Sequence, residues 1–349
     1  MHVIHIVESF ATGTFEFIRL LIKYSPEEVH TIIYSERELN IEEAKAKFSD
    51  NVSFIPWRFA QREIGLNDVK AAMFLRKELK KLEYDVVHLH SSKAGILGRL
   101  AAFTIGEQRV IFTPNGASFA RRDISKKSKL FYILIERLVA KMSGKVVCCS
   151  RSERDLFIRH GIHADFVSNA TETNFTQPST KFDRFTIVTS GRIGPQKNPE
   201  LFNTIAQSAS FEKIQFLWIG DGDEREKLGA QNIEITGWVS REEALNLISQ
   251  SHIYLSTALW EGLPFSVLEA MAAGLPTVLM DIPPHRDMTR DGINGYLYKT
   301  EEEAVKALNK VSKSDRLNKL GEESHRLIKQ EFSADRMAKS YLSHYRSLL

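Results

Sequence analysis

Four charged side chains in the second half of the 349-residue chain have the types and spacing of a binding site. Arg192 and Lys197 stand in the segment GRIGPQKNP. Glu261 and Glu269 lie on either side of the turn GLP in WEGLPFSVLEAMAAG. An arginine fork and a lysine point charge suit a diphosphate, whereas carboxylates suit hydroxyl groups such as those of a ribose. These residue types predict a ligand that carries both a diphosphate and hydroxyl groups.

The second segment is predicted to begin a helix between its two glutamates. Pro264 fits the first position of a helix that runs to Gly274. The N–H groups of its first turn, at about residues 265–267, have no partner within the helix and favour an anion. A nucleoside diphosphate sugar matches, with Glu261 on the sugar and Glu269 on the ribose. The other residues predicted to line this donor side are Gly191, Gly220, Gly262, Leu263, Pro264, Phe265, Ser266 and Val267.

Other interpretations of these residues remain open. Arg192 and Lys197 can be unrelated cations of a surface loop. Glu269 can interact favourably with the helix dipole while Glu261 is solvated. The two glutamates can also be the acid and nucleophile of a glycosidase, a site that has no need for a pair of cations. The cations together with the helix N–H groups favour an anionic leaving group, and therefore transfer over hydrolysis.

The elements that must position these residues follow an alternating pattern. Short apolar runs are followed by helix-length segments, which is typical of a parallel sheet covered on both faces. We predict an α/β protein with two Rossmann-like domains facing a central cleft, residues 1–168 and 169–333, and a C-terminal helix, 334–349, that packs back on the first domain. Strands are predicted at residues 2–7, 30–34, 52–55, 86–90, 110–113, 145–149, 185–189, 214–219, 233–236, 253–256 and 277–279.

Composition and charge narrow the class of protein. The chain is 43% hydrophobic and 26% charged with a net charge of +3, which is typical of a globular protein and gives no argument for nucleic acid. Residues 119–145 hold eight basic and two acidic residues around an apolar run, so this segment is a surface helix or a contact with an anionic membrane. No long apolar span is present, and we expect a cytoplasmic protein.

The chain resembles the retaining glycosyltransferases of family 4, which have the two-domain GT-B fold. The motifs that carry the resemblance are GRIGPQKNP, IGDGDEREKL, ITGWVSREEA, WEGLPFSVLEAMAAGLP and DGINGYLY. In the first half, DVVHLHSSKAGILGRLAA resembles the members that build bacterial polysaccharide and lipopolysaccharide. The resemblance implies that the second domain binds the nucleotide sugar and the first binds the acceptor. It also implies a uridine nucleotide, with Trp238 and Val239 near the base, and no metal or cofactor.

Two segments of the first half depart from the family pattern. The loop SFATGTFEF keeps Gly13, followed by Thr14, where the family usually has paired glycines. In FTPNGASF, Asn115 replaces the usual histidine; asparagine can hydrogen-bond a sugar hydroxyl but cannot titrate near neutral pH. The acceptor side is predicted to include Gly13, Thr14, His88, His90, Ser91 and Lys93. The two histidines can instead be packed in the interior, and a metal pair is the least favoured interpretation.

These patterns predict a retaining transferase that moves a hexosyl or N-acetylhexosaminyl group from a nucleotide sugar to a lipid-linked or cell-surface polysaccharide precursor. Arg192, Lys197, Glu261 and Asn115 are the predicted catalytic residues, without metal. The alternative is a non-catalytic partner of a glycosyltransferase complex that binds nucleotide sugar without turnover. The expected location is the cytoplasm, at the inner face of the plasma membrane.

Overall fold

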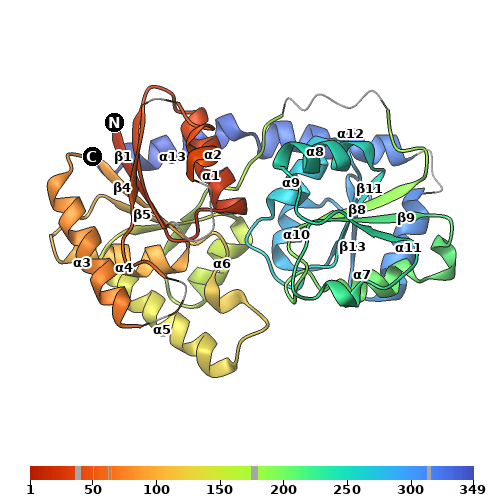
Figure 1. Ribbon diagram of the computed structural model, residues 1–349, viewed down its shortest axis with the longest axis horizontal. Coiled ribbons are helices and arrows are strands. Elements are labelled where there is room, and N and C mark those ends of the chain that lie inside the picture. Colours follow the sequence, from red (N-terminus) through yellow and green to blue (C-terminus); the bar gives the residue numbers. More distant parts are fainter. Residues whose placement is uncertain (36–40, 50, 62, 64, 174–179, 313–315) are drawn as a thin grey trace. The chain divides into compact units, whose positions relative to one another are not determined.

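The structure is a computed structural model that describes residues 1–35, 41–49, 51–61, 63, 65–173, 180–312 and 316–349 (Figure 1). The chain forms two compact units, each built around a parallel sheet. Unit 1 comprises Met1–Asn169 and Ala334–Leu349, and unit 2 comprises Ala170–Ser333. The predicted α/β class and alternating order of elements are confirmed.

Unit 1 contains a seven-stranded sheet in the order β3-β2-β1-β4-β5-β6-β7, with every pair parallel. The central strands are buried because helices cover both faces of the sheet, and their side chains are mostly apolar apart from the histidines of β1, β2 and β4. The strands are β1 (His2–Val7), β2 (Val29–Tyr34), β3 (Val52–Pro56), β4 (Val86–His90), β5 (Val110–Thr113), β6 (Lys145–Cys148) and β7 (Ala164–Phe166). The helices are α1 (Thr12–Lys23), α2 (Ile41–Lys45), α3 (Leu66–Lys81), α4 (Ser91–Phe103), α5 (Lys126–Met142), α6 (Arg151–Arg159) and α13 (Ala334–Arg346), with a 3-10 turn at Ser118–Ala120.

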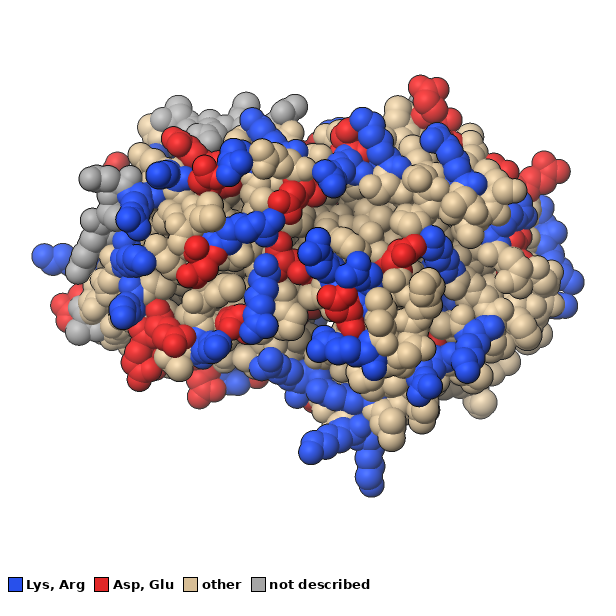
Figure 2. All heavy atoms as spheres, turned by 180° about the vertical axis from the view of Figure 1, so that it is seen from behind, with Lys and Arg blue, Asp and Glu red and all other residues tan. Residues whose placement is uncertain are grey.

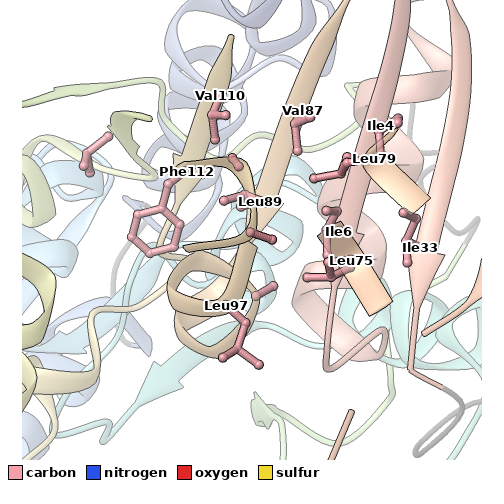
Figure 3. Packing of buried hydrophobic residues seen from close by; sticks show 14 of the residues in the cluster. Ile4, Ile6, Ile33, Leu75, Leu79, Val87, Leu89, Leu97, Val110 and Phe112 are labelled. Atoms are coloured by element: carbon pink, nitrogen blue, oxygen red, sulfur yellow. The ribbon is translucent and has the colours of Figure 1, made fainter. Parts of the chain in front are cut away.

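One face of the unit 1 sheet packs against α3, α4 and α5. Its side chains come from alternate strand positions, such as Ile4 and Ile6 on β1 and Val87 and Leu89 on β4, and they meet Leu75 of α3 (Figure 3). Helix α4 packs between α3 and α5, so these three helices form one layer (Figure 1). The outer side of this layer is a surface of the unit.

The opposite face of the same sheet carries four buried histidines beneath α1 and α13. His5, His30, His88 and His90 have no exposed surface. The ring of Phe17 from α1 packs against His88 and His90. From α13, the hydroxyl of Tyr345 is hydrogen-bonded to Nδ1 of His88 at 2.7 Å. The C-terminal helix is therefore part of the packing of unit 1.

Unit 2 contains a six-stranded parallel sheet in the order β10-β9-β8-β11-β12-β13. Its strands are β8 (Thr186–Ser190), β9 (Gln215–Ile219), β10 (Ile233–Ile235), β11 (Ile253–Ser256), β12 (Thr277–Met280) and β13 (Gly295–Tyr298). Its helices are α7 (Pro199–Ala206), α8 (Arg241–Gln250), α9 (Phe265–Ala272), α10 (Pro283–Met288), α11 (Glu301–Ser312) and α12 (Arg316–Glu331), with 3-10 turns at Ala209–Phe211 and Arg225–Lys227. Trp218 and Phe202 pack edge to face in its core.

Two strands and one helix boundary differ from the sequence prediction. Edge strands β7 and β13 were not predicted, because ADF is too short and polar for an apolar run and GYLY follows a turn-rich segment. Pro264 is the cap of α9, with an extended ψ of 122°, and the first helical residue is Phe265. The helix ends at Ala272, before Gly274 takes a positive φ of 74°. Proline is extended here because its ring fixes φ while ψ stays free to turn the chain into the helix.

Candidate active site

The carboxyl ends of β8 and β9 approach each other closely at two glycines. Gly191 and Gly220 have φ values of +135° and +132°, a region that favours glycine. A Cβ atom on Gly220 would lie 2.4 Å from the carbonyl oxygen of Gly191, so a side chain there would displace backbone. Trp218 Nε1 donates a 2.9 Å hydrogen bond to that same oxygen. The loop that carries Arg192 is therefore held tightly against the neighbouring strand.

Lys197 and Glu261 form an ion pair across the ends of neighbouring strands β8 and β11. Lys197 Nζ lies 2.8 Å from Glu261 Oε1, and both side chains are mostly buried, with 16% and 10% exposed. Gln196 Nε2 donates to the other carboxylate oxygen of Glu261 at 3.0 Å. Burial opposes the charge of Lys197, but the Glu261 carboxylate outweighs it and raises the pKa of Lys197 above its ordinary value. Lys197 is therefore a fixed cation at neutral pH.

The two loops also hold each other through backbone groups. Thr257 Oγ1 donates to the carbonyl of Lys197, and the Leu259 N–H donates to the carbonyl of Gln196 at 2.8 Å. Asn198 caps α7, since its side chain accepts from the Leu201 N–H at 3.4 Å. The position of Lys197 is thus set by a cap on one side and by the β11 loop on the other.

Helix α9 begins at Phe265, four residues after Glu261, at the end of the same loop. Leu263 and Val267 are buried, and they anchor the first turn in unit 2. Phe265 and Ser266 are half-buried between them. The first N–H groups of a helix have no carbonyl partner within it and carry the positive end of the helix dipole. The carboxylate, the loop and the helix start thus follow one another within a few residues.

Glu269 points from α9 to the start of α8. Arg241 Nη2 donates to Glu269 Oε1 at 2.8 Å, and the carboxylate side chain is 12% exposed. Sequence reasoning did not identify Arg241, although it lies in the motif ITGWVSREEA. Trp238 and Val239, in the same motif, are exposed, and the Arg192 guanidinium lies 5.9 Å from the Trp238 ring. This motif therefore contacts both Arg192 and Glu269.

In unit 1, Asn115 stands on a constrained turn after β5. It has a positive φ of 53°, and both polar atoms of its amide are buried without a hydrogen-bond partner among the described residues. The turn is fixed by Glu153, whose two oxygens accept from the N–H groups of Gly116 and Cys149 at 2.9 Å. Burial raises the pKa of Glu153, although these hydrogen bonds oppose the rise. Sequence reasoning missed Glu153; its signal is the capping pattern SRSE, in which Ser150 caps α6.

The other residues predicted for the acceptor side are at the starts of α1 and α4. Thr14, next to Gly13 in the first turn of α1, lies 3.5 Å from the hydroxyl of Ser91, so the two helix starts meet. Lys93 instead turns to the start of α3 and pairs with Asp68 at 2.7 Å.

The histidines predicted for the acceptor side lie in the interior. His88 is hydrogen-bonded at both ring nitrogens, to Tyr345 and to Thr113. His90 is bonded to His5 at 3.0 Å, and both are fully buried. The structure therefore shows the packed arrangement, because an acceptor in solvent has no access to either ring. The ring nitrogens of His5, His88 and His90 lie within 4.8 Å of one another. His5 is hydrogen-bonded to His30 and His90, and burial lowers the pKa of all four buried rings, so they are uncharged at neutral pH.

Comparisons with known proteins identify the family and the fold of this chain. A family model described as "Glycosyltransferase Family 4" matches residues 13–174, and one described as "Glycosyl transferases group 1" matches residues 171–332. A UDP-Gal:alpha-D-GlcNAc-diphosphoundecaprenol alpha-1,3-galactosyltransferase of Escherichia coli is 28% identical over 72% of this chain and 73% of its own. The structure of HepE from Anabaena with UDP and glucose aligns with a TM-score of 0.80 at 14% identity, covering 99% of this chain and 100% of HepE. The lipopolysaccharide outer core galactosyltransferase WaaB aligns at 0.73 with 20% identity, covering both chains fully.

Two parallel α/β units with these neighbours define the GT-B class of glycosyltransferases. The chain belongs to glycosyltransferase family 4, and its two family matches together span most of its length. It is a glycosyltransferase that uses a nucleotide sugar.

Proposed function

We propose that this protein transfers a hexosyl or N-acetylhexosaminyl group from a UDP-sugar, with retention of configuration, to a hydroxyl of a lipid-linked precursor of a cell-surface polysaccharide. The observation that carries the proposal is the Lys197–Glu261 ion pair at the carboxyl ends of β8 and β11, directly before the start of α9. Ligands of parallel sheets bind at the carboxyl ends of the strands, and the ion pair places a fixed cation and a carboxylate next to each other there.

Each residue of this site has a role that its chemistry suits. Arg192 and Lys197 hold the diphosphate together with the N–H groups at the start of α9. Glu261 accepts hydrogen bonds from hydroxyls of the donor sugar, and Glu269, fixed by Arg241, accepts them from the ribose. Trp238 and Val239 lie beside the base.

Retention follows when the acceptor hydroxyl attacks from the face that the diphosphate leaves. The bond from the acceptor oxygen to the anomeric carbon forms as the bond to the diphosphate oxygen breaks, and a leaving phosphate oxygen takes the acceptor proton. The charge that develops on the diphosphate is stabilised by the two cations and the helix start, so the mechanism requires no metal. Asn115 contributes a hydrogen bond to a hydroxyl, because an amide has no proton to exchange near neutral pH.

The donor and acceptor classes are supported by relatives. The E. coli relative takes its galactose from a UDP-sugar and acts on a diphosphoundecaprenol-linked sugar, as its name states. HepE is a structural neighbour that binds UDP and glucose. Uridine as the base and a lipid-linked glycan as the acceptor are the corresponding proposals for this chain.

A thermal-shift experiment with UDP, GDP, ADP and CMP, without added metal, tests the donor site. We expect UDP to raise the Tm of the wild-type protein, because a ligand that binds the folded state stabilises it by mass action. Glu269→Ala is expected to lose most of this shift, since the ribose then has no carboxylate. Glu243→Ala, at an exposed position of α8, is the matched control and is expected to keep it. A UDP shift of equal size in Glu269→Ala would remove that residue from the site.

The second candidate is a non-catalytic partner that binds nucleotide sugar. Asn115 favours it, because the family histidine at this position is absent. Turnover separates the candidates: both bind UDP, but a transferase also releases UDP from the sugar donor when an acceptor is present.

We also propose peripheral contact of α5 with an anionic membrane at the inner face of the plasma membrane. Leu130, Leu134 and Leu138 lie one helical turn apart on α5 and are more than half exposed. Lysine and arginine side chains project from the end of unit 1 where α5 begins (Figures 1 and 2). Among the described residues, no helix is long and apolar enough to cross a membrane.

Neutralising Lys126, Lys127 and Lys129 to glutamine is expected to weaken binding to phosphatidylglycerol vesicles about tenfold or more, since each surface cation contributes about 1 kcal/mol. Vesicle sedimentation at low and high salt measures the effect. Neutralising the exposed Lys306, Lys319 and Lys329 of unit 2 in the same way is the control and should leave binding unchanged. Equal binding by wild type and the α5 variant contradicts the contact.

A further inference from the structure

A hollow of about 800 Å³ lies between the end of β3 and the length of α3. It is on unit 1, at the edge strand of the sheet, and shares no residue with the donor site. Its lining combines apolar and basic side chains: Ile55, Pro56, Arg58, Phe59, Lys70, Met73, Phe74, Arg76, Lys77, Glu78 and Lys81. We call it the α3 hollow.

Helix α3 has apolar side chains on its outer side as well as on its core side. Ala71, Leu75 and Leu79 are buried against the sheet. Leu66 and Met73 are 87% and 65% exposed, and Val69 between them is also exposed, so these three form a row at helical spacing. Phe59, at the mouth of the hollow, is half exposed. A row of this kind beside a hollow marks a contact surface, since a surface helix ordinarily turns polar residues to water.

The charges around this row are almost all positive. Five cations line the hollow against one acidic residue, Glu78, which pairs with Lys81 at 2.9 Å. Arg58, Arg76 and Lys77 make no ion pair within the part of the chain that the structure describes. Lys70 lies 5.9 Å from the Phe59 ring, so charge and apolar surface are adjacent. The matching ligand is anionic at one end and apolar at the other.

We propose that the α3 hollow binds one anionic lipid of the bilayer, with its phosphate near Lys70, Arg76 and Lys77 and an acyl chain along Met73 and Phe74. A second copy of this chain does not suit the surface, because a two-fold interface would bring two such positive patches together. A free phosphate would satisfy the cations but leave Leu66, Val69 and Met73 in water. A membrane lipid satisfies both.

The position of α3 agrees with a bilayer partner. Helices α3 and α5 lie on either side of α4 in one layer (Figure 1). Both carry exposed apolar side chains, among them Met73 of α3 and Leu134 of α5. The inference rests on the peripheral membrane contact proposed above and adds a second, lipid-selective point of attachment. With two contacts, unit 1 has a defined orientation on the membrane instead of a single pivot.

Charge reversal in the hollow tests the proposal. Arg76→Glu/Lys77→Glu is expected to weaken binding to phosphatidylglycerol-containing vesicles about tenfold or more, and Met73→Asp to weaken it by a similar factor. The matched control, Lys319→Glu/Lys329→Glu on α12 of unit 2, changes the net charge equally and should bind within about threefold of wild type. Wild-type affinity in both hollow variants overturns the proposal. Circular dichroism and an unchanged UDP-induced thermal shift show that the variants are folded.

A site-specific probe distinguishes the possible occupants. Both native cysteines, Cys148 and Cys149, are fully buried, so Phe59→Cys can be labelled with an environment-sensitive maleimide dye. Its emission should shift to the blue on phosphatidylglycerol vesicles but not on phosphatidylcholine vesicles, or with inorganic phosphate. A label at Lys306→Cys, an exposed position of unit 2 away from the donor site, is the control and should not respond.

Two results of this probe overturn the lipid assignment. An equal response to inorganic phosphate would indicate a free-anion site. A response that follows protein concentration without vesicles, together with a doubled mass in light scattering, would indicate a second copy. Failure of UDP to shift the Tm would remove the proposed donor, but it would leave the vesicle result and the hollow standing.

Discussion

Lys197→Ala is expected to lower kcat by about 10²- to 10³-fold, which corresponds to about 2–4 kcal/mol of lost stabilisation of the departing diphosphate. The lysine is mostly buried and its pKa is raised by Glu261 after burial is overcome, so it is charged throughout the neutral range. Alanine removes that charge from a site where water cannot replace it well. UDP release from a UDP-sugar in the presence of acceptor measures the effect.

Two further variants separate catalysis from stability. Lys197→Arg keeps the cation and is expected to recover part of the rate. Lys181→Ala removes a lysine that donates to the carbonyls of Ser249 and Ser251. These residues precede β8 and β11, at the amino ends of the same strands. This control is expected to lower Tm with kcat unchanged. Near-full activity of Lys197→Ala would show that the lysine is no part of the reaction.

The ion pair makes the roles of Lys197 and Glu261 interdependent. Removal of the lysine also leaves Gln196 as the side chain that holds the Glu261 carboxylate among the described residues, so Glu261 can move away from the sugar. The losses of activity in the single variants of Lys197 and Glu261 are therefore not expected to add up to the loss in the double variant, because the two residues are in direct contact. In the proposed mechanism the lysine has two roles, as a ligand of the diphosphate and as the group that orients Glu261.

Much of the fold could be predicted from local pattern, whereas the pairings in the site could not. Buried strands such as QFLWI of β9 are recognisable because parallel strands covered on both faces are almost wholly apolar. Edge strand β7, with the sequence ADF, carries no such pattern, because it is defined by its hydrogen bonds to β6. A helix cap such as Asn198 is likewise recognisable from local sequence, since it involves residues only three positions apart.

The partners of the site residues come from distant positions. Arg241 and Glu269 are 28 residues apart, and Gln196 and Glu261 are 65 apart. Spacing along the chain contains no information on such contacts, which depend on how helices and loops meet above the sheet. For the same reason, alternation placed His88 and His90 on one face of a strand, but the α13 helix that covers them is more than 200 residues away.

Acid is expected to destabilise unit 1 because of its four buried histidines. Burial lowers the pKa of His30 to about 4 and that of His90 to about 3. It also lowers the pKa of His5 and His88 well below the ordinary 6.5, with neighbouring histidines adding to the effect. In the unfolded chain each imidazole regains its ordinary pKa.

The sign follows from proton uptake. Above pH 6.5 both states are neutral and the histidines have no effect on stability; below it the unfolded chain binds protons that the folded unit does not. Between pH 7.5 and 5.5 each histidine therefore lowers the free energy of unfolding by a little over about 1 kcal/mol, and the four together by about 5 kcal/mol. That loss equals the whole free energy of unfolding of a marginally stable domain. Unit 1 is thus expected to open well before the carboxylates titrate.

Hydrogen exchange measured peptide by peptide at pH 7.5 and 5.5 follows this loss in β1 and β4, separately from unit 2. After correction for the intrinsic effect of pH on exchange, the free energy of opening should fall by about 5 kcal/mol in these strands. His90→Gln removes one of the four buried imidazoles, so the fall should shrink by about a quarter. His163→Gln, at an exposed position, is the control and should leave it unchanged. An equal opening free energy at both pH values would mean that the folded histidines accept protons, and that the network beneath α13 tolerates charge.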